Sequence, residues 1–240
     1  QDNPQQHEDE FPTELVSLLQ NFAHMGKTPN EDLDEPSPVV DSSKYLSGDA
    51  ARVLGEMLLA SGTAIVRPVS EAKNGHSITT EDVIKKWAEY SIKGCNQQPC
   101  LDYSTNAVKN LREAQQREGV QSSNTYENLE LPSKMMFPVR KVTTSIKQRC
   151  GGGGVRLRPT AAVALVALLE KIGLEGMREA LALERPRGGD KEFQQNHVNG
   201  NITVDVDDVL RSVYLCKTHG RITMDLGKMF VRHSPMVSPK

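Results

Sequence analysis

A one-sided run of positive charge is the most distinctive chemical feature of the sequence. Between Leu131 and Leu169 there are seven Lys or Arg residues and no Asp or Glu. They are Lys134, Arg140, Lys141, Lys147, Arg149, Arg156 and Arg158. A charge field of one sign over such a stretch is typical of a surface that contacts a polyanion. Taken alone, the run suits a solvated face as well as it suits a DNA-binding surface.

Neither the glycines nor the histidines form a catalytic motif. Residues 151–154 are four consecutive glycines, which could suggest the phosphate-binding loop of a nucleotide hydrolase. However, the pattern G-x-x-x-x-G-K-[ST] is absent, and no strand is expected before the run. The six histidines show no HExxH or triad-like spacing. The sequence therefore predicts a flexible loop here, no enzymatic activity and no cofactor.

The cysteines suggest free thiols. They are Cys95, Cys100, Cys150 and Cys216. The first two are spaced C-x4-C, but no second close Cys or His pair follows, so we expect no metal site. No disulfide framework, signal peptide or membrane span is evident, and we expect an intracellular protein.

The net charge of −2 conceals a polarised chain. Residues 1–130 hold 11 basic and 21 acidic side chains, whereas residues 131–240 hold 18 basic and 10 acidic ones. At 240 residues, one or two domains are expected.

The basic run must be held by three consecutive elements. We expect a short amphipathic helix over residues 137–149, a glycine-rich loop, and a long helix over residues 160–183. Nine consecutive apolar residues, 161–169, open the long helix. They are too few to span a bilayer and too apolar for a surface helix, so this helix should be buried. A polar insertion, 184–200, and a short helix within 201–217 should follow.

The first half predicts a similar series of helices. Residues 1–10 should be a disordered tail, and residues 11–23 a short helix with Pro12 in its first turn. A helix over residues 44–72 should follow, capped by Ser42 and Ser43, with Pro68 kinking it or ending it early. The acidic loop before it, residues 27–41, is either a solvated insertion or a site for basic partners.

Three further segments complete the first half. A cap at Thr80 should begin a helix that ends near Tyr90 and buries Trp87 in the core. Residues 100–118 should form another amphipathic helix, and residues 119–134 a polar linker.

The two halves repeat one plan of short helix, loop, long helix, loop and short helix. Val204 corresponds to Ile78, and Val209 to Val83. One such unit cannot bury its long helix, but two units packed head to tail can. The repeat permits a packing in which the long helices cross and the first loop of each unit lies beside the second loop of the other.

Several of these residues match a known family. The second half resembles core histone 2A, whose first helix opens with Phe-Pro-Val and nearby basic residues, as residues 137–141 do here. The family also has an Arg just before its central helix, where Arg156 stands, and an extended docking tail similar to residues 220–228. The central helix matches at Val163, Leu165, Ala167, Leu169, Glu170 and Glu175.

The first half resembles histone 2B. Ser42, Ser43 and Lys44 match the Ser-Ser-Lys of that family before its central helix, and residues 77–79 match its second loop. The order 2B then 2A resembles the fused histone doublets of large DNA viruses of the marseillevirus type. This resemblance implies an all-α fold, with two histone folds in tandem forming an intramolecular handshake. The folds would span residues 11–118 and 135–217, with a docking tail at 218–240.

The resemblance also implies a function. Such a doublet packages DNA in a nucleosome-like particle with a fused doublet of the other two core histone types, with two copies per particle, in the host nucleus or viral factory and in the virion. DNA would be held without base specificity, with Arg156 in the minor groove. The remaining DNA-binding candidates are Arg140, Lys141, Lys147, Arg158, Ser42, Ser43, Lys44, Lys73, Ser77, Thr79 and Thr203, the last standing where the family has Arg.

Two other surfaces follow from the resemblance. Glu170 and Glu175 would keep part of the acidic patch of the family, although Arg178 stands where a further acid is expected. Partner docking would use Gly220, Ile222, Met224 and Leu226. The alternative function is a histone-fold interaction module, such as a transcription-factor subunit or a chaperone-like adaptor, which the acidic first half favours.

Overall fold

The computed structural model describes residues 4–26, 28, 30, 42–90, 97–117, 129–152, 154–182 and 202–215. Across these residues the chain is mostly helical, and its strands are two segments of three residues each. The expected all-α class is therefore confirmed. The docking candidates Gly220, Ile222, Met224 and Leu226, together with the insertion 184–200, lie outside the described residues.

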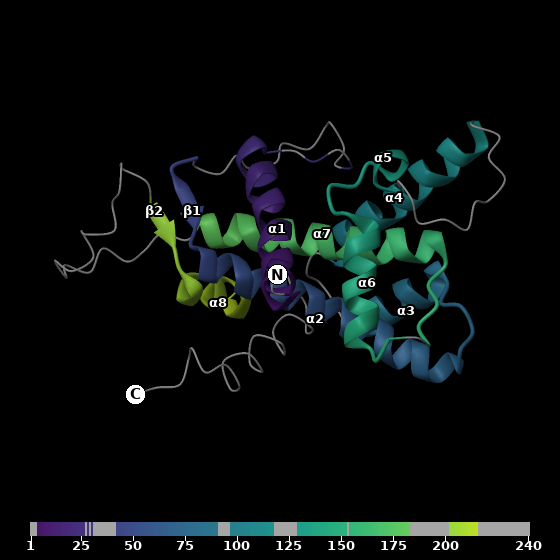
Figure 1. The fold of residues 1–240 in the computed structure, drawn as a ribbon. Coiled ribbons are helices and arrows are strands. Elements are labelled where there is room, and N and C mark those ends of the chain that lie inside the picture. The colour runs from purple at the N-terminus through teal and green to yellow at the C-terminus, as the bar shows by residue number, and fades with distance from the viewer. Residues whose placement is uncertain are drawn as a thin grey trace.

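The helices follow one another in two series (Figure 1). The first series comprises α1 (Pro4–Met25), α2 (Gly48–Lys73), α3 (Thr80–Tyr90) and α4 (Gln97–Arg117). The second comprises α5 (Glu130–Ser133), α6 (Val139–Arg149), α7 (Pro159–Ala182) and α8 (Val206–Leu215). Strand β1 (Lys44–Leu46) precedes α2, and strand β2 (Ile202–Val204) precedes α8.

Helix α7 is the centre of the core. Every residue from Ala161 to Glu170 is buried, and α1, α2, α3, α4, α6 and α8 all contact this helix. At Gly173 a Cβ atom would lie 2.6 Å from Leu19 Cδ1 and 2.9 Å from Leu58 Cδ1, so any other residue there would displace the ends of these two side chains of α1 and α2. The predicted buried helix and the contact between the two long helices are confirmed. Trp87 is also buried in the core, as expected.

The loops pair reciprocally between the two series. Strand β1, between α1 and α2, runs parallel to β2, between α7 and α8. Ile78, between α2 and α3, forms a parallel bridge with Leu157, between α6 and α7. In Figure 1 the strands lie at one end of α7 and helix α3 lies towards the other. The first loop of each series therefore lies beside the second loop of the other, an arrangement that the repeat permits.

Pro12 does not lie in the first turn of its helix, and Pro68 does not end α2 early. Helix α1 begins at Pro4, so residues 4–10 are helical and do not form the predicted tail. A proline suits the first position of a helix because its missing N–H has no intrahelical partner there. Pro12 and Pro68 both lie inside helices, and α2 continues past Pro68 to Lys73. Packing of Val69 against the core favours this continuation over the local preference of proline.

The start of α2 also differs from the prediction. Its N-cap is Ser47, whose hydroxyl accepts a hydrogen bond from Ala50 N at 3.2 Å, so Ser42 and Ser43 do not cap it. The reason is that β1 pairs with β2, which keeps residues 44–46 extended. The pairing continues to the next residue, where Ser47 N donates to Val204 O at 2.8 Å. A long-range contact has therefore moved the helix start.

The predicted linker, residues 119–134, contains the short helix α5 and is packed at that end. Leu129 and Ser133 are buried. The amide of Asn30, from the acidic loop, donates to Ser133 O at 3.1 Å and to Lys134 O at 3.0 Å, and Asn110 of α4 donates to Asn30 Oδ1 at 2.9 Å. The acidic loop is therefore anchored at Asn30, which is buried, and is not solvated along its whole length.

Candidate nucleic-acid interface

The strongest cationic candidates, Arg156 and Arg158, flank a buried residue. Ile78 N donates to Arg156 O at 2.7 Å, and Arg158 N donates to Ile78 O at 3.1 Å. Leu157 between them is buried, whereas both arginines are exposed, as alternation along an extended segment requires. Within the described part of the chain, neither guanidinium has a hydrogen-bond or ion-pair partner. Both are therefore available to an anionic ligand.

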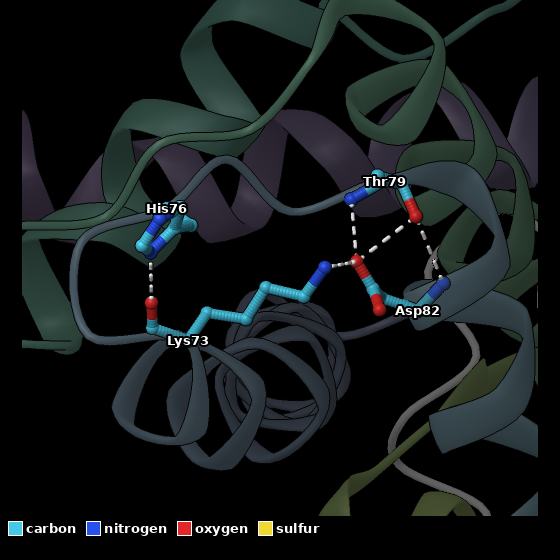
Figure 2. A network of polar contacts seen from close by, with 4 residues as sticks. All are labelled: Lys73, His76, Thr79 and Asp82. Atoms are coloured by element: carbon cyan, nitrogen blue, oxygen red, sulfur yellow. Dashed lines mark hydrogen bonds and ion pairs between the residues drawn. The ribbon is translucent and has the colours of Figure 1, made fainter.

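Lys73 and Thr79, from the paired loop, have partners inside the protein (Figure 2). Lys73 Nζ lies 2.6 Å from Asp82 Oδ2, and Thr79 N and Thr79 Oγ1 donate to the same oxygen at 2.8 and 2.9 Å. Burial raises the pKa of Asp82, but the hydrogen bonds from Lys73 and Thr79 together lower it by more. These donors, predicted to bind DNA, are committed to Asp82. Ser77 is half-buried in the same loop.

The cap of α3 is therefore Thr79, one residue before the predicted Thr80. Asp82 N lies 3.4 Å from Thr79 Oγ1, and Asp82 in return accepts from Thr79 N, which is a reciprocal capping box. Thr80 instead donates its hydroxyl to Thr160 Oγ1 at 3.1 Å, which joins the start of α3 to the start of α7.

The second loop pair, β1 with β2, contains Lys44 and Thr203, and Ser42 and Ser43 directly precede β1. Ser42 and Thr203 are exposed, and the side chains of Ser43 and Lys44 are half-buried. Residues 42–49 and 202–208 contain one Lys and four Asp, whereas residues 73–82 and 155–160 contain three Lys or Arg, one Asp and one Glu. The two loop pairs therefore have the same backbone pairing and opposite charge balance.

The basic residues of α6 face the first series. Arg140 and Lys141 are exposed near its start, and Lys141 Nζ lies 3.5 Å from Glu14 Oε2 of α1. Lys147 is half-buried, and desolvation lowers its pKa. Arg149 forms a bidentate ion pair with Glu56 of α2, with both N–O distances at 2.9 Å. Two of the basic residues of α6, Lys141 and Arg149, are thus partly neutralised by acids of the first series.

Sequence reasoning missed Arg67. This exposed residue of α2 donates from Nη2 to Arg149 O at 2.5 Å, at the carboxyl end of α6, where a cation is favoured by the helix dipole. It adds a cation beside the basic loop. Burial raises the pKa of the Cys150 thiol, and the positive charge of Arg67 offsets part of that rise. No local signal could have placed Arg67 here, because the two residues are 82 positions apart.

The predicted acidic patch is not a surface feature at Glu170, which is fully buried. Its Oε1 accepts from the Tyr103 hydroxyl at 2.5 Å, and its Oε2 accepts from Met136 N at 2.9 Å and Phe137 N at 2.7 Å. Glu170 therefore joins α4 and the segment before α6 to α7. The assignment to an acidic patch is wrong, because helix α4 and residues 136–137 cover the carboxylate.

Glu175 is partly exposed but neutralised. Lys171 Nζ lies 2.8 Å from Glu175 Oε1, and Arg178 Nη1 lies 3.3 Å from the same oxygen. Arg178 is itself buried and donates to Gly26 O at 3.0 Å. Glu175 therefore offers no uncompensated negative charge to a basic ligand.

Other kinds of site find no support in the described part of the chain. Its residues contain no cluster of three or more His, Cys, Asp or Glu with the geometry of a metal site. None of its helices combines the length and the apolar character needed to cross a membrane. A scan against protein-family models finds no match to the chain, and a search of curated proteins finds none either.

Proposed function

We propose that the chain is a fused histone doublet that packages DNA. In this proposal, α1–α3 and α6–α8 are two histone folds joined in a handshake, and α4 is the additional helix of the 2B-like half. The observation that carries the proposal is the reciprocal pairing of loops, β1 with β2 and Ile78 with Leu157, around two long helices in contact. That arrangement is what the repeat of short, long and short helices requires in order to bury α7.

DNA is the ligand that the charge distribution favours. Arg156 and Arg158 are exposed on a segment whose backbone pairs with Ile78. Arg67 contacts the basic end of α6, which precedes this segment in the chain. Cations of this kind neutralise phosphates and release counterions, which gives affinity without base specificity. The acidic second loop pair should contribute much less. In the proposal, therefore, each doublet contacts DNA mainly through the end that contains Arg156 and through α6.

The proposed partner is a fused doublet of the other two core histone types, with two copies of each chain per particle. Residues 218–240, including Gly220, Ile222, Met224 and Leu226, would dock onto that partner. The proposed setting is the host nucleus or viral factory and the virion. No catalytic step is part of the proposal.

Nuclease digestion of reconstituted DNA tests this function. The chain is mixed with DNA in decreasing salt, with and without the partner doublet, and the protected fragments are sized. We expect discrete protection of about 120–147 base pairs only when both doublets are present. A smear at every salt concentration would contradict the proposal.

A second candidate is a histone-fold module that binds proteins. The ion pairs Arg149–Glu56 and Lys141–Glu14, together with the buried Glu170, favour it, because they reduce the free charge that DNA or patch ligands would use. The two candidates differ in salt response. DNA binding that weakens steeply with salt supports the doublet, whereas weak, salt-insensitive binding supports the adaptor.

A further inference from the structure

Three donors converge on a single carboxylate oxygen beside the proposed DNA contact. Asp82 Oδ2 receives Lys73 Nζ at 2.6 Å, Thr79 N at 2.8 Å and Thr79 Oγ1 at 2.9 Å (Figure 2). The Lys73 and Asp82 side chains are 31% and 24% exposed, so the pair lies at the surface. The segment that contains Thr79 is the one whose Ile78 pairs with the backbone of Arg156 and Arg158.

Capping of α3 does not by itself require the lysine. The corresponding helix, α8, has the same reciprocal box, with Asp205 N donating to Asp208 Oδ2 at 3.2 Å and Asp208 N donating to Asp205 Oδ1 at 3.1 Å. The capping bonds of α3 likewise run between Thr79 and Asp82 and do not involve Lys73. The contact of Lys73 is therefore an addition to the capping motif.

We propose that Asp82 is an internal competitor for DNA phosphate, which holds Lys73 out of the protein–DNA contact and so limits the affinity of this loop pair. This inference rests on the proposed function. A carboxylate oxygen and a phosphate oxygen are both anionic acceptors for the hydrogen bonds of an ammonium group. The carboxylate of Asp82 is already in place, because two donors of Thr79 also bind it. Of the three cations of this loop pair, Arg156 and Arg158 then contact DNA without Lys73.

The salt dependence of DNA binding tests the competition. Affinity of the full chain for a short DNA duplex is measured by fluorescence anisotropy over a sodium chloride series, for wild type, Lys73→Ala, Asp82→Asn and the double variant. Each phosphate neutralised contributes about 0.9 to the slope of log affinity against log salt. We expect Lys73→Ala to leave the slope unchanged, Asp82→Asn to raise it by about 0.9, and the double variant to return it to the wild-type value.

Asp208→Asn is the matched control, because it alters the corresponding capping box and removes the same charge at the other loop pair. It should leave the slope unchanged. Circular dichroism spectra establish that each variant is folded. If Asp82→Asn does not fold, the slope of log affinity against log salt for Lys73→Ala tests the inference by itself. A slope equal to that of wild type supports the competition, and a slope lower by about 0.9 overturns it.

Two further results would also overturn the inference. One is a slope for Asp82→Asn equal to that of Asp208→Asn, which would leave Asp82 with a capping role only. The other is wild-type binding without salt dependence, which would remove the proposed function and this inference together. A normal wild-type slope with a reduced slope for Lys73→Ala, by contrast, would overturn only the role of Asp82.

Discussion

Replacement of Glu170 by alanine should destabilise the fold by about 3 kcal/mol. Its carboxylate accepts hydrogen bonds from the Tyr103 hydroxyl and from the backbone amides of Met136 and Phe137, and it is fully buried. Alanine on α7 would remove both oxygens and leave these donors without acceptors. Helix α4 and the start of α6 would then lose a shared attachment to α7.

The magnitude follows from the burial of each donor. Tyr103 and Phe137 are buried, and each donor left unsatisfied costs about 1–3 kcal/mol. Met136 is partly exposed, so its amide can bind water and should contribute little. The two buried donors therefore account for about 2–6 kcal/mol. Removal of the carboxylate also relieves its desolvation, which places the expected loss in the lower half of that range.

Urea denaturation followed by far-UV circular dichroism measures the change in the free energy of unfolding. Tyr103→Phe should lose about 1–2 kcal/mol, because it removes one of the three hydrogen bonds. Glu179→Ala, at an exposed position of the same helix, is the matched control and should stay within about 0.5 kcal/mol of wild type. A loss below about 1 kcal/mol for Glu170→Ala would show that this network does not hold α4 and α6 in place.

Three further predictions concern the interface, the helix packing and the thiols. Arg156→Ala with Arg158→Ala should reduce the salt slope of DNA binding by up to about 1.8, so that a fourfold rise in salt weakens the affinity of wild type about twelve-fold more than that of the variant. An unchanged slope would exclude these residues from the contact. The free energy of unfolding should be unaffected, because both side chains are exposed. Gly55→Ala should lower the free energy of unfolding by about 1–3 kcal/mol, because its Cβ would lie 2.2 Å from a backbone oxygen of α1, and a neutral result in urea denaturation would contradict that close approach. Burial raises the pKa of the Cys100 thiol to about 12. In the folded protein at pH 8, iodoacetamide should therefore alkylate Cys100 much more slowly than the half-buried Cys150, as measured by peptide mass spectrometry. Equal rates would contradict the burial of Cys100.

Local patterns were sufficient to predict most of the helices. The series from α6 through the glycine-rich loop to α7 follows from amphipathic spacing, glycine content and a continuous apolar run, all of which act between near neighbours in the chain. The repeat permits the reciprocal pairing of the loops but does not by itself predict it, because covering the long apolar helix does not fix which loops meet.

Long-range contacts decided the features that the sequence analysis missed. Pairing of β1 with β2 moved the cap of α2 from Ser42 and Ser43 to Ser47, and packing carried α2 past Pro68. Glu170 is part of the core and not of a surface patch, because segments far away in the sequence cover it.

The charge available to a ligand was also decided by tertiary structure. The sequence by itself determined how many basic residues lie near the glycine-rich loop and on which elements they occur. Only the folded chain determined which of them remain unpaired, because Glu56 is 93 residues from its partner Arg149 and Glu14 is 127 residues from Lys141. Helix periodicity depends on neighbours a few residues apart, whereas ion pairing depends on which surfaces the packing of α1, α2 and α6 brings together.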